Sequence, residues 1–204
     1  YFFFFFFPAE NYTTSSKMGK FLIRKGTTDF QFINYAYERK VKEYMIENID
    51  SFDVFIDVGA CMGEYCIWLA KLGKKCIAIE PVNFEAVKKN IALNNLENSV
   101  MAFQCGLGSK NEKVYFNIPE GLPSASFRDS ENNHEPNAEI KTLDSLYKDF
   151  NLNDSSRILM KLDVEGMEEE IIEGGKEFIS KFKDLKCIYE HFSEDDYKND
   201  KALS

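Results

Sequence analysis

An apolar run that ends in an acid and a glycine turn, followed by a second run with an acidic end, most constrains the fold of this chain. The first run covers residues 52–58 and leads into Gly59 and Gly63, and the second covers 75–79 and ends at Glu80. Apolar residues at 3.6-residue spacing predict a helix over 64–72 between them. This succession indicates a right-handed βαβ unit of a parallel sheet, which binds ligands at the carboxyl ends of its strands.

The residues of the turn are typical of a nucleotide-cofactor site. Without a Cβ, Gly59 and Gly63 permit positive φ and the close approach of a ligand to the backbone. The carboxylate of Glu80 can accept both hydroxyls of a ribose. The pattern is acid-x-Gly-x-x-x-Gly from Asp57 onward, whereas dinucleotide enzymes have Gly-x-Gly-x-x-Gly. A nicotinamide site, or a strand-to-helix turn without any ligand, remains an alternative at this point.

A third apolar run, residues 158–163, also ends in an acid. Asp163 follows this buried run, so we expect it at the same sheet edge as the acids of the first two runs, where ligands bind. Glu165 lies on the turn that follows. Residues 168–170 are also acidic, but carboxylates at a helix N-terminus are stabilised by the helix dipole, which explains them without a function.

The order of these motifs resembles the FkbM family of class I S-adenosylmethionine (SAM) methyltransferases. The shared segments, in chain order, are 24–29, 57–60, 94–96, 141–146, the K-[ILV]-D-[ILV]-E-G-x-E signature within 158–168, and Gly174-Gly175. The resemblance covers roughly residues 21–192. Two departures stand out: the family usually has Asn where this chain has Cys61, and it usually continues well past residue 204.

The resemblance implies an α/β fold with a Rossmann-like, doubly wound and mostly parallel sheet, and a SAM-dependent methyltransferase activity. The FkbM family is associated with O-methylation of sugars, glycolipids and small hydroxylated metabolites. A catalytically degenerate SAM-binding fragment and, with less support, an NAD-type oxidoreductase are the alternatives.

The expected site follows from the motifs and the resemblance together. The residues assigned to the cofactor are Asp57, Gly59, Ala60, Cys61, Gly63, Glu80, Pro81, Gln104 and Cys105. Gln104 and Cys105 end the third strand, where they are placed to flank adenine. A hydroxyl acceptor benefits from a general base, and the candidates are Asp163 first, then Glu165 and His191.

Composition and charge restrict the function further. The 204 residues are enough for one α/β domain. The net charge of −9, without a Lys/Arg run, argues against a nucleic-acid or anionic-membrane surface, so we expect a small molecule or glycan as substrate. Five cysteines without a C-x-x-C pair and only two histidines predict no metal site. Unpaired cysteines and the lack of a secretion signal favour a cytoplasmic location.

The two ends of the chain depart from a globular pattern. Residues 1–17 begin with a run of Phe that is too short to span a bilayer, and we expect a low-complexity or disordered tail there. The FkbM-like domain is then expected over residues 18–204. Class I methyltransferases normally finish with two antiparallel strands, which the polar residues 192–204 cannot supply, so we expect a domain truncated at its C-terminus.

The remaining pattern predicts further elements around the cofactor half. We expect helices over 35–49 and 84–94, the latter with Asn83 as N-cap, and strands over 100–105, 113–118, 138–143 and 185–189. The segment 119–137 is rich in Pro, Gly, Ser and Asn. A loop of this length is either functional or disordered, so a substrate-side loop and plain disorder both remain open.

Overall fold

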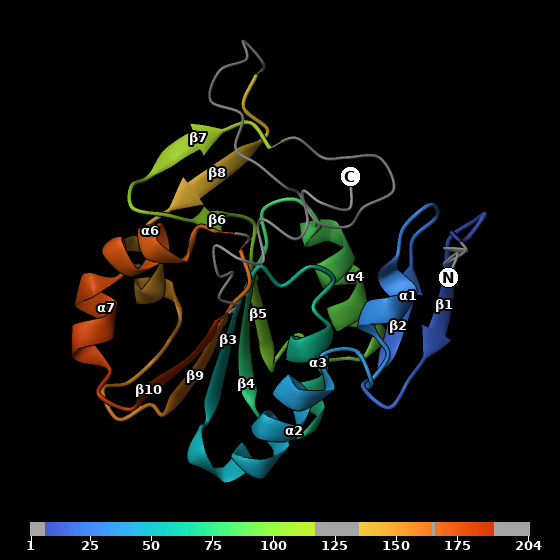
Figure 1. Cartoon of the computed structure of the whole chain (residues 1–204), viewed down its shortest axis with the longest axis horizontal. Helices are drawn as coiled ribbons and strands as arrows, with labels where there is room; N and C mark the ends of the chain where they lie inside the picture. Colours follow the sequence, from blue (N-terminus) through green and yellow to red (C-terminus); the bar gives the residue numbers. More distant parts are fainter. Residues whose placement is uncertain (1–6, 117–134, 165, 190–204) are drawn as a thin grey trace, which may run out of the picture.

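Among the residues that the structure describes (7–116, 135–164 and 166–189), five parallel strands form the central sheet of this computed structural model, in the order β10-β9-β3-β4-β5 (Figure 1). The strands are β3 (Val54–Val58), β4 (Lys75–Ile79), β5 (Val100–Phe103), β9 (Ile158–Leu162) and β10 (Leu185–Tyr189). Within this sheet, the first strand in the chain is the central β3. The chain then adds β4 and β5 on one side, and later β9 and β10 on the other. This order confirms the predicted doubly wound α/β fold.

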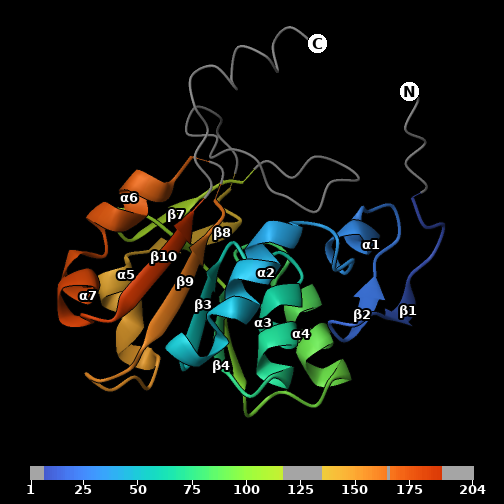
Figure 2. The same cartoon turned by 60° about the horizontal axis from the view of Figure 1, so that its bottom comes forward.

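Helices cover both faces of this sheet (Figure 2). They are α1 (Asp29–Phe32), α2 (Arg39–Glu47), α3 (Glu64–Lys71), α4 (Phe84–Leu93), α5 (Leu143–Leu146), α6 (Glu168–Glu173) and α7 (Lys176–Lys181), with 3-10 turns at Ile49–Ser51 and Tyr147–Asp149. Alternate strand residues face opposite ways. Phe55 and Leu159 therefore pack with α2, α3 and α4, whereas Ile56 and Met160 pack with α5, α6 and α7.

An N-terminal hairpin is docked on the α4 side of the sheet. Strands β1 (Tyr12–Ser15) and β2 (Lys20–Ile23) pair in antiparallel fashion. Asn94 exchanges two hydrogen bonds with the backbone of Lys20, at 2.9 and 2.7 Å. The buried side chain of Asn90 accepts from the Leu22 amide at 2.8 Å and donates to the Met62 carbonyl at 2.9 Å. These asparagines therefore couple the hairpin to α4 and to the glycine turn.

A small second sheet lies above the carboxyl ends of the main strands, in the order β6-β8-β7 (Figure 1). Its strands are β6 (Gly106–Leu107), β7 (Glu112–Val114) and β8 (Ala138–Lys141). The segment after β8 begins α5 with Thr142 as a side-chain N-cap. The Asp144 carboxylate accepts from the amides of Glu177 and Phe178 at 3.0 and 2.8 Å, which caps α7. The 141–146 segment that resembles the FkbM family thus has a structural explanation.

The structure differs from the expected elements at a few places. The helix predicted over 35–49 begins only at Arg39, because Glu38 adopts a left-handed conformation with φ of 48°. Tyr12–Ser15 forms a strand inside the segment expected to be a tail, because its backbone pairs with β2. Asn83 occupies the N-cap position of α4, but its side chain makes no capping hydrogen bond. Most of the long loop, residues 119–134, lies outside the described residues.

Gly59, the residue after β3, is in close contact with the backbone of Asp163, the residue after β9. It has a φ of +83°, and a Cβ built on it would lie 2.0 Å from the backbone carbonyl oxygen of Asp163. That separation is far below van der Waals contact. The positive φ agrees with the expectation, but the neighbour that excludes a side chain is the protein's own backbone.

Replacing Gly59 by Ala is therefore expected to destabilise the fold strongly. The matched control is Gly73→Ala, since Gly73 has a similar φ of +88° and open space around its missing Cβ. The control should cost about 1 kcal/mol for the left-handed conformation, and Gly59→Ala about 1–3 kcal/mol more for the clash. Urea unfolding of the two variants measures the difference. Equal losses would show that the strand ends separate without cost.

Candidate functional site

Three neighbouring strands bring the predicted acids to one edge of the sheet. Asp57 is the fourth residue of β3, and Glu80 and Asp163 directly follow β4 and β9. The amide of Asp163 donates to the Val58 carbonyl at 3.1 Å, and the amide of Glu80 donates to the Phe103 carbonyl at 3.1 Å. Strand pairing therefore continues to the edge, and the acids come together as the sequence predicted.

The Glu80 carboxylate links the glycine turn to the start of α4. One oxygen accepts from the Cys61 amide at 2.9 Å, and the other accepts from the amides of Val82 and Asn83 at 2.9 and 2.8 Å. Burial raises the pKa of Glu80, and these hydrogen bonds and the nearby Arg24 oppose that effect. A carboxylate offers about four lone-pair sites. The oxygen that accepts from Val82 and Asn83 also has a long contact of 3.5 Å from the side-chain amide of Asn83. The further capacity of Glu80 to accept therefore lies at the oxygen that accepts from the Cys61 amide.

Arg24 belongs to this edge, although it was not among the predicted site residues. Its guanidinium pairs with the fully buried Asp29 through two bonds, at 2.8 and 2.9 Å. It also donates to the side-chain oxygen of Asn83, which explains why Asn83 does not cap α4. The sequence did contain a signal for this ion pair, because Arg24 and Asp29 are the first and last residues of the 24–29 segment that resembles the FkbM family. Arg24 thereby connects the N-terminal hairpin to the Glu80 side of the site.

Cys61 has a left-handed backbone, with φ of 50°. Burial raises the pKa of its thiol well above the usual range, so the side chain is neutral at pH 7. A left-handed conformation disfavours most side chains, and Asn is one of the few that tolerate it. The conformation gives a physical reason for the Asn that the resemblance to the FkbM family implies at this position.

Two buried carboxylates lie behind the turn without full compensation. Asp57 on β3 is 1% exposed, and Glu64 at the start of α3 is 5% exposed. Burial is the main cause that raises the pKa of Asp57 to about 7 and that of Glu64 to about 8. Within the described part of the chain, Oδ1 of Asp57 and Oε2 of Glu64 have no hydrogen-bond partner. Sequence reasoning named Asp57 but missed Glu64, whose burial depends on the packing of α3.

Lys161 lies between the acids of the two central strands. It is the register partner of Asp57 in the β3–β9 pair, and its Nζ is 2.5 Å from Oδ2 of Asp163. The Asp163 side chain is 33% exposed, whereas that of Lys161 is 8% exposed. Asp163 therefore faces solvent at the edge and Lys161 stays beneath it.

Residues from the start of α2 close the buried side of this group. The hydroxyl of Tyr65 donates to Glu38 at 2.6 Å. The fully buried Lys42 donates to the Tyr37 carbonyl, and its Nζ lies 4.8 Å from the centre of the Tyr65 ring. Burial lowers the pKa of Lys42. The left-handed Glu38 thus delivers a carboxylate to the site from a segment that the sequence predicted to be plain helix.

The other predicted site residues fall in different places. Gly63, with φ of 81°, precedes the first turn of α3, and Ala60 is 2% exposed. Gln104 is exposed just after β5, whereas the Cys105 side chain is buried in the core with Leu107. The position of Cys105 results from the chain turning into β6, so its side chain does not face the predicted adenine position. Pro81 is partly exposed beside Glu80, and Glu165 and His191 lie outside the described residues.

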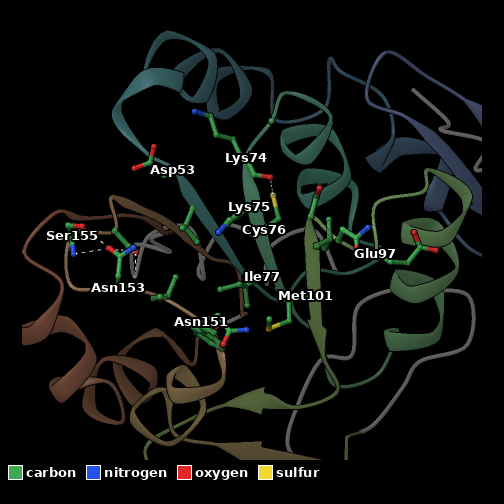
Figure 3. Close-up of a pocket in the computed structure, with 18 residues that line it drawn as sticks. Asp53, Lys74, Lys75, Cys76, Ile77, Glu97, Met101, Asn151, Asn153 and Ser155 are labelled. Carbon is green, nitrogen blue, oxygen red and sulfur yellow. Dashed lines mark hydrogen bonds between the residues drawn. The ribbon is translucent and has the colours of Figure 1, made fainter.

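A cavity of about 590 Å³ lies at the other end of the sheet (Figure 3). It is lined by the first residues of β3, β4 and β5, together with residues 150–156. Two of its charged residues are already bonded: Asp53 makes two bonds with Arg157, at 2.6 and 2.8 Å, and Lys74 donates to the Phe52 carbonyl at 2.9 Å. We place the functional site at the carboxyl edge, because the buried carboxylates of Asp57 and Glu64, each with an unpartnered oxygen among the described residues, lie there and not in this cavity.

The described residues lack two features that would point to other classes of site. None of the helices in this part of the chain is both long and apolar enough to cross a membrane. The same residues contain no cluster of three or more His, Cys, Asp or Glu side chains arranged to hold a metal ion.

Comparison with known proteins identifies the family. Residues 57–201 match the model of the methyltransferase FkbM domain. The chain belongs to the FkbM methyltransferase domain family. The matched segment of this FkbM chain begins at Asp57 and includes the glycine turn, Glu80 and the Lys161–Asp163 segment.

Individual relatives match the FkbM chain over different shares of its length. Methyltransferase sdnD of Sordaria araneosa is 31% identical over 87 residues, which make up 41% of this chain and 34% of that protein. The crystal structure of the FkbM methyltransferase from Methylobacillus flagellatus KT matches with a TM-score of 0.46 and 20% identity, over 67% of this chain and 32% of the other. The N-terminal domain of human METTL16, solved in complex with S-adenosylhomocysteine (SAH), matches with a TM-score of 0.38 and 15% identity, over 82% of this chain and 58% of the other. The matched part of this chain thus spans about a third of the first two relatives.

The left-handed conformation at position 61 predicts that Cys61→Asn in this FkbM domain is tolerated. Asn accommodates this φ at least as well as Cys, so the free energy of unfolding should stay within about 0.5 kcal/mol of the wild type or rise. Urea denaturation measures it, with Cys61→Val as the contrast because a β-branched side chain is disfavoured at positive φ. A large loss in the Asn variant would show that packing, not backbone conformation, decides this position.

The raised pKa of Glu64 predicts a pH-dependent effect of Glu64→Gln. A carboxyl with a pKa of about 8 in the folded state holds its proton more tightly than in the unfolded chain, so its contribution to stability falls as pH rises from about 4 to 8. Without ligand, the Gln variant should be more stable than the wild type by about 1–3 kcal/mol at pH 8.5 and nearly equal at pH 5.

Urea unfolding at the two pH values checks this prediction. Glu85→Gln is the matched control, because Glu85 also lies in the first turn of a helix but is exposed, with Lys88 at 3.2 Å. The control should change little at either pH. A Glu64→Gln variant that is less stable at pH 8.5 would contradict the assigned burial penalty.

Proposed function

We propose that this chain is a SAM-dependent methyltransferase that O-methylates a sugar, a glycolipid or another small hydroxylated metabolite. Membership of the FkbM methyltransferase domain family supports methyl transfer. The acidic edge supports the choice of cofactor. The acceptor class is what the resemblance to FkbM methyltransferases implies.

The observation that carries the proposal is the pair of buried carboxylates with unpartnered oxygens. Asp57 and Glu64 lie directly behind the glycine turn, and each has an oxygen without a partner among the described residues. Buried polar groups without partners are costly, so a ligand that supplies a positive group gains affinity there. SAM carries an α-ammonium group whose N–H bonds can be donated to both acids, whereas the cationic nicotinamide ring of NAD has no N–H on its charged nitrogen and its pyrophosphate is repelled by carboxylates.

The remaining edge residues fit other parts of SAM. Glu80 retains the capacity to accept from ribose hydroxyls, and it also fixes the turn through the Cys61 amide. Gln104 is exposed after β5, where it is placed to contact adenine. When bound, SAM supplies an electrophilic methyl group on a sulfonium sulfur. The protein's task is then to bind it, orient it and present the acceptor in line.

Asp163 is the proposed acceptor-side residue. It is partly exposed at the same edge, and its backbone is fixed by pairing with Val58. A carboxylate there accepts the hydrogen bond of an incoming hydroxyl, orients the oxygen and receives its proton as the methyl group is transferred. Glu165 and His191 remain further candidates for this role on sequence grounds alone.

Calorimetry with S-adenosylhomocysteine (SAH) and NAD tests the cofactor assignment. We expect SAH to bind the wild type and NAD not to bind. Glu80→Gln keeps an acceptor oxygen for the turn but removes the charge, and it should weaken SAH binding by about 1.5–3 kcal/mol, the range for a hydrogen bond to a charged group. Asp163→Asn should leave SAH affinity within about twofold, because Asp163 is assigned to the acceptor.

The outcomes separate the competing functions. Binding of NAD in place of SAH would support a nucleotide-dependent oxidoreductase. Binding of SAH without turnover of radiolabelled SAM against sugar and small-metabolite hydroxyl panels would support a degenerate SAM-binding protein. An equal loss of SAH affinity in Glu80→Gln and Asp163→Asn would move Asp163 to the cofactor site.

A further inference from the structure

Lys161 is the positively charged residue of the FkbM signature segment, and the proposed reaction assigns no role to it. It lies in the central part of the molecule, 6% exposed, on β9 beside β3. Its Nζ is 2.5 Å from Asp163 and 5.2 Å from the centre of the Tyr65 ring. Lys161 therefore reaches the carboxyl edge from below, between the cofactor-side and acceptor-side acids.

The charges around Lys161 come from every element packed against it. Asp57 lies on β3, Glu64 at the start of α3 and Asp163 after β9, and Glu38 and Lys42 approach from the start of α2. Four acids thus surround two lysines. Lys42 directs its hydrogen bond to the Tyr37 carbonyl, whereas Lys161 bonds directly to a carboxylate.

Lys161 cannot serve as a base at neutral pH. Burial by itself lowers the pKa of its ammonium, but the attraction of Asp57, Asp163 and the other nearby acids outweighs burial and raises the pKa well above the usual value. Its contribution is a permanent, buried positive charge. Such a charge acts most strongly on the groups nearest to it, because the surroundings are poorly screened.

We propose that Lys161 is a positioning residue of the cofactor site, whose buried ammonium lies opposite Asp57 in the strand register, balances the charge of that acid when it receives the α-ammonium group of SAM, and holds Asp163 at the mouth of the site. This inference rests on the proposed SAM-dependent function. The bond from Lys161 engages Oδ2 of Asp163, and among the described residues Oδ1 has no hydrogen-bond partner. One carboxylate oxygen is thus anchored by Lys161, which leaves the other to accept from the acceptor hydroxyl of the proposed reaction.

The effect of Lys161 on Asp57 determines how SAH binding depends on pH. Asp57 has a pKa of about 7, raised by burial and lowered by Lys161. If ionised Asp57 receives the ligand ammonium, SAH affinity rises as pH increases through this value. Removing the lysine charge destabilises the ionised form of Asp57 and raises its pKa, so the rise in SAH affinity should occur at higher pH.

Three variants isolate the charge from the shape of the side chain. Lys161→Met removes the charge and keeps a flexible chain, and Lys161→Arg keeps the charge. Lys74→Met is the matched control, because Lys74 also lies 5.2 Å from an aromatic ring, that of Phe52, and makes a hydrogen bond. It lies at the amino end of the sheet, away from the proposed site.

SAH calorimetry from pH 6 to 8.5 is the decisive measurement, and a 13C NMR titration of the Asp57 carboxyl, assigned with Asp57→Asn, reports ionisation directly. For Lys161→Met we expect about a tenfold loss of SAH affinity at pH 7 and a midpoint moved up by about one pH unit. Lys161→Arg should recover most of the affinity and restore the midpoint. Lys74→Met should match the wild type.

Several outcomes would overturn the proposal. Unchanged affinity and an unchanged midpoint in Lys161→Met would remove Lys161 from the site. If that variant does not fold, Asp57→Asn/Lys161→Met, which removes the opposing charge as well, is expected to fold. If the double variant also failed to fold, Lys161 would be shown to act through its packing and not through its charge. A wild type that does not bind SAH would instead refute the proposed function, so the two failures are distinguishable.

Discussion

The close contact between the backbone at Gly59 and the carbonyl of Asp163 sets the geometry of the whole carboxyl edge. The two strand ends approach so closely that a Cβ on Gly59 would lie 2.0 Å from that oxygen. The contact aligns β3 with β9, which places Lys161 opposite Asp57 in the strand register. Asp57 and Asp163 therefore depend on one backbone approach for their common location.

The electrostatics of this edge differ from those of an ordinary folded interior. Carboxylates are usually buried only with full compensation. Here two carboxylates with pKa values of about 7 and 8 are combined with one lysine that bonds to a third acid. Such groups reduce the stability of the ligand-free protein above neutral pH. In the proposed function, the ammonium group of the cofactor supplies the charge that stabilises their ionised forms. Functional sites commonly carry this kind of perturbed ionisation.

The motifs shared with the FkbM family divide into structural and functional parts. Asp144 caps α7, and Asn94 docks the N-terminal hairpin on α4, so these residues have sufficient reasons in folding. Arg24 is intermediate, because its pair with Asp29 is structural while its bond to Asn83 reaches the neighbourhood of Glu80. The Lys161–Asp163 segment is the clearest candidate for function, since its charges lie at the sheet edge where ligands bind.

The sequence by itself determined the parallel α/β sheet, the strands on either side of the glycine turn, and the gathering of Asp57, Glu80 and Asp163. Those features follow from local patterns, because apolar runs and their acidic ends repeat along the chain. Only the tertiary structure decided that Glu64 is buried, that Glu38 interrupts the predicted helix and bonds to Tyr65, and that Cys105 faces the core. These positions depend on packing between elements distant in sequence, and on a left-handed residue, neither of which periodicity reveals.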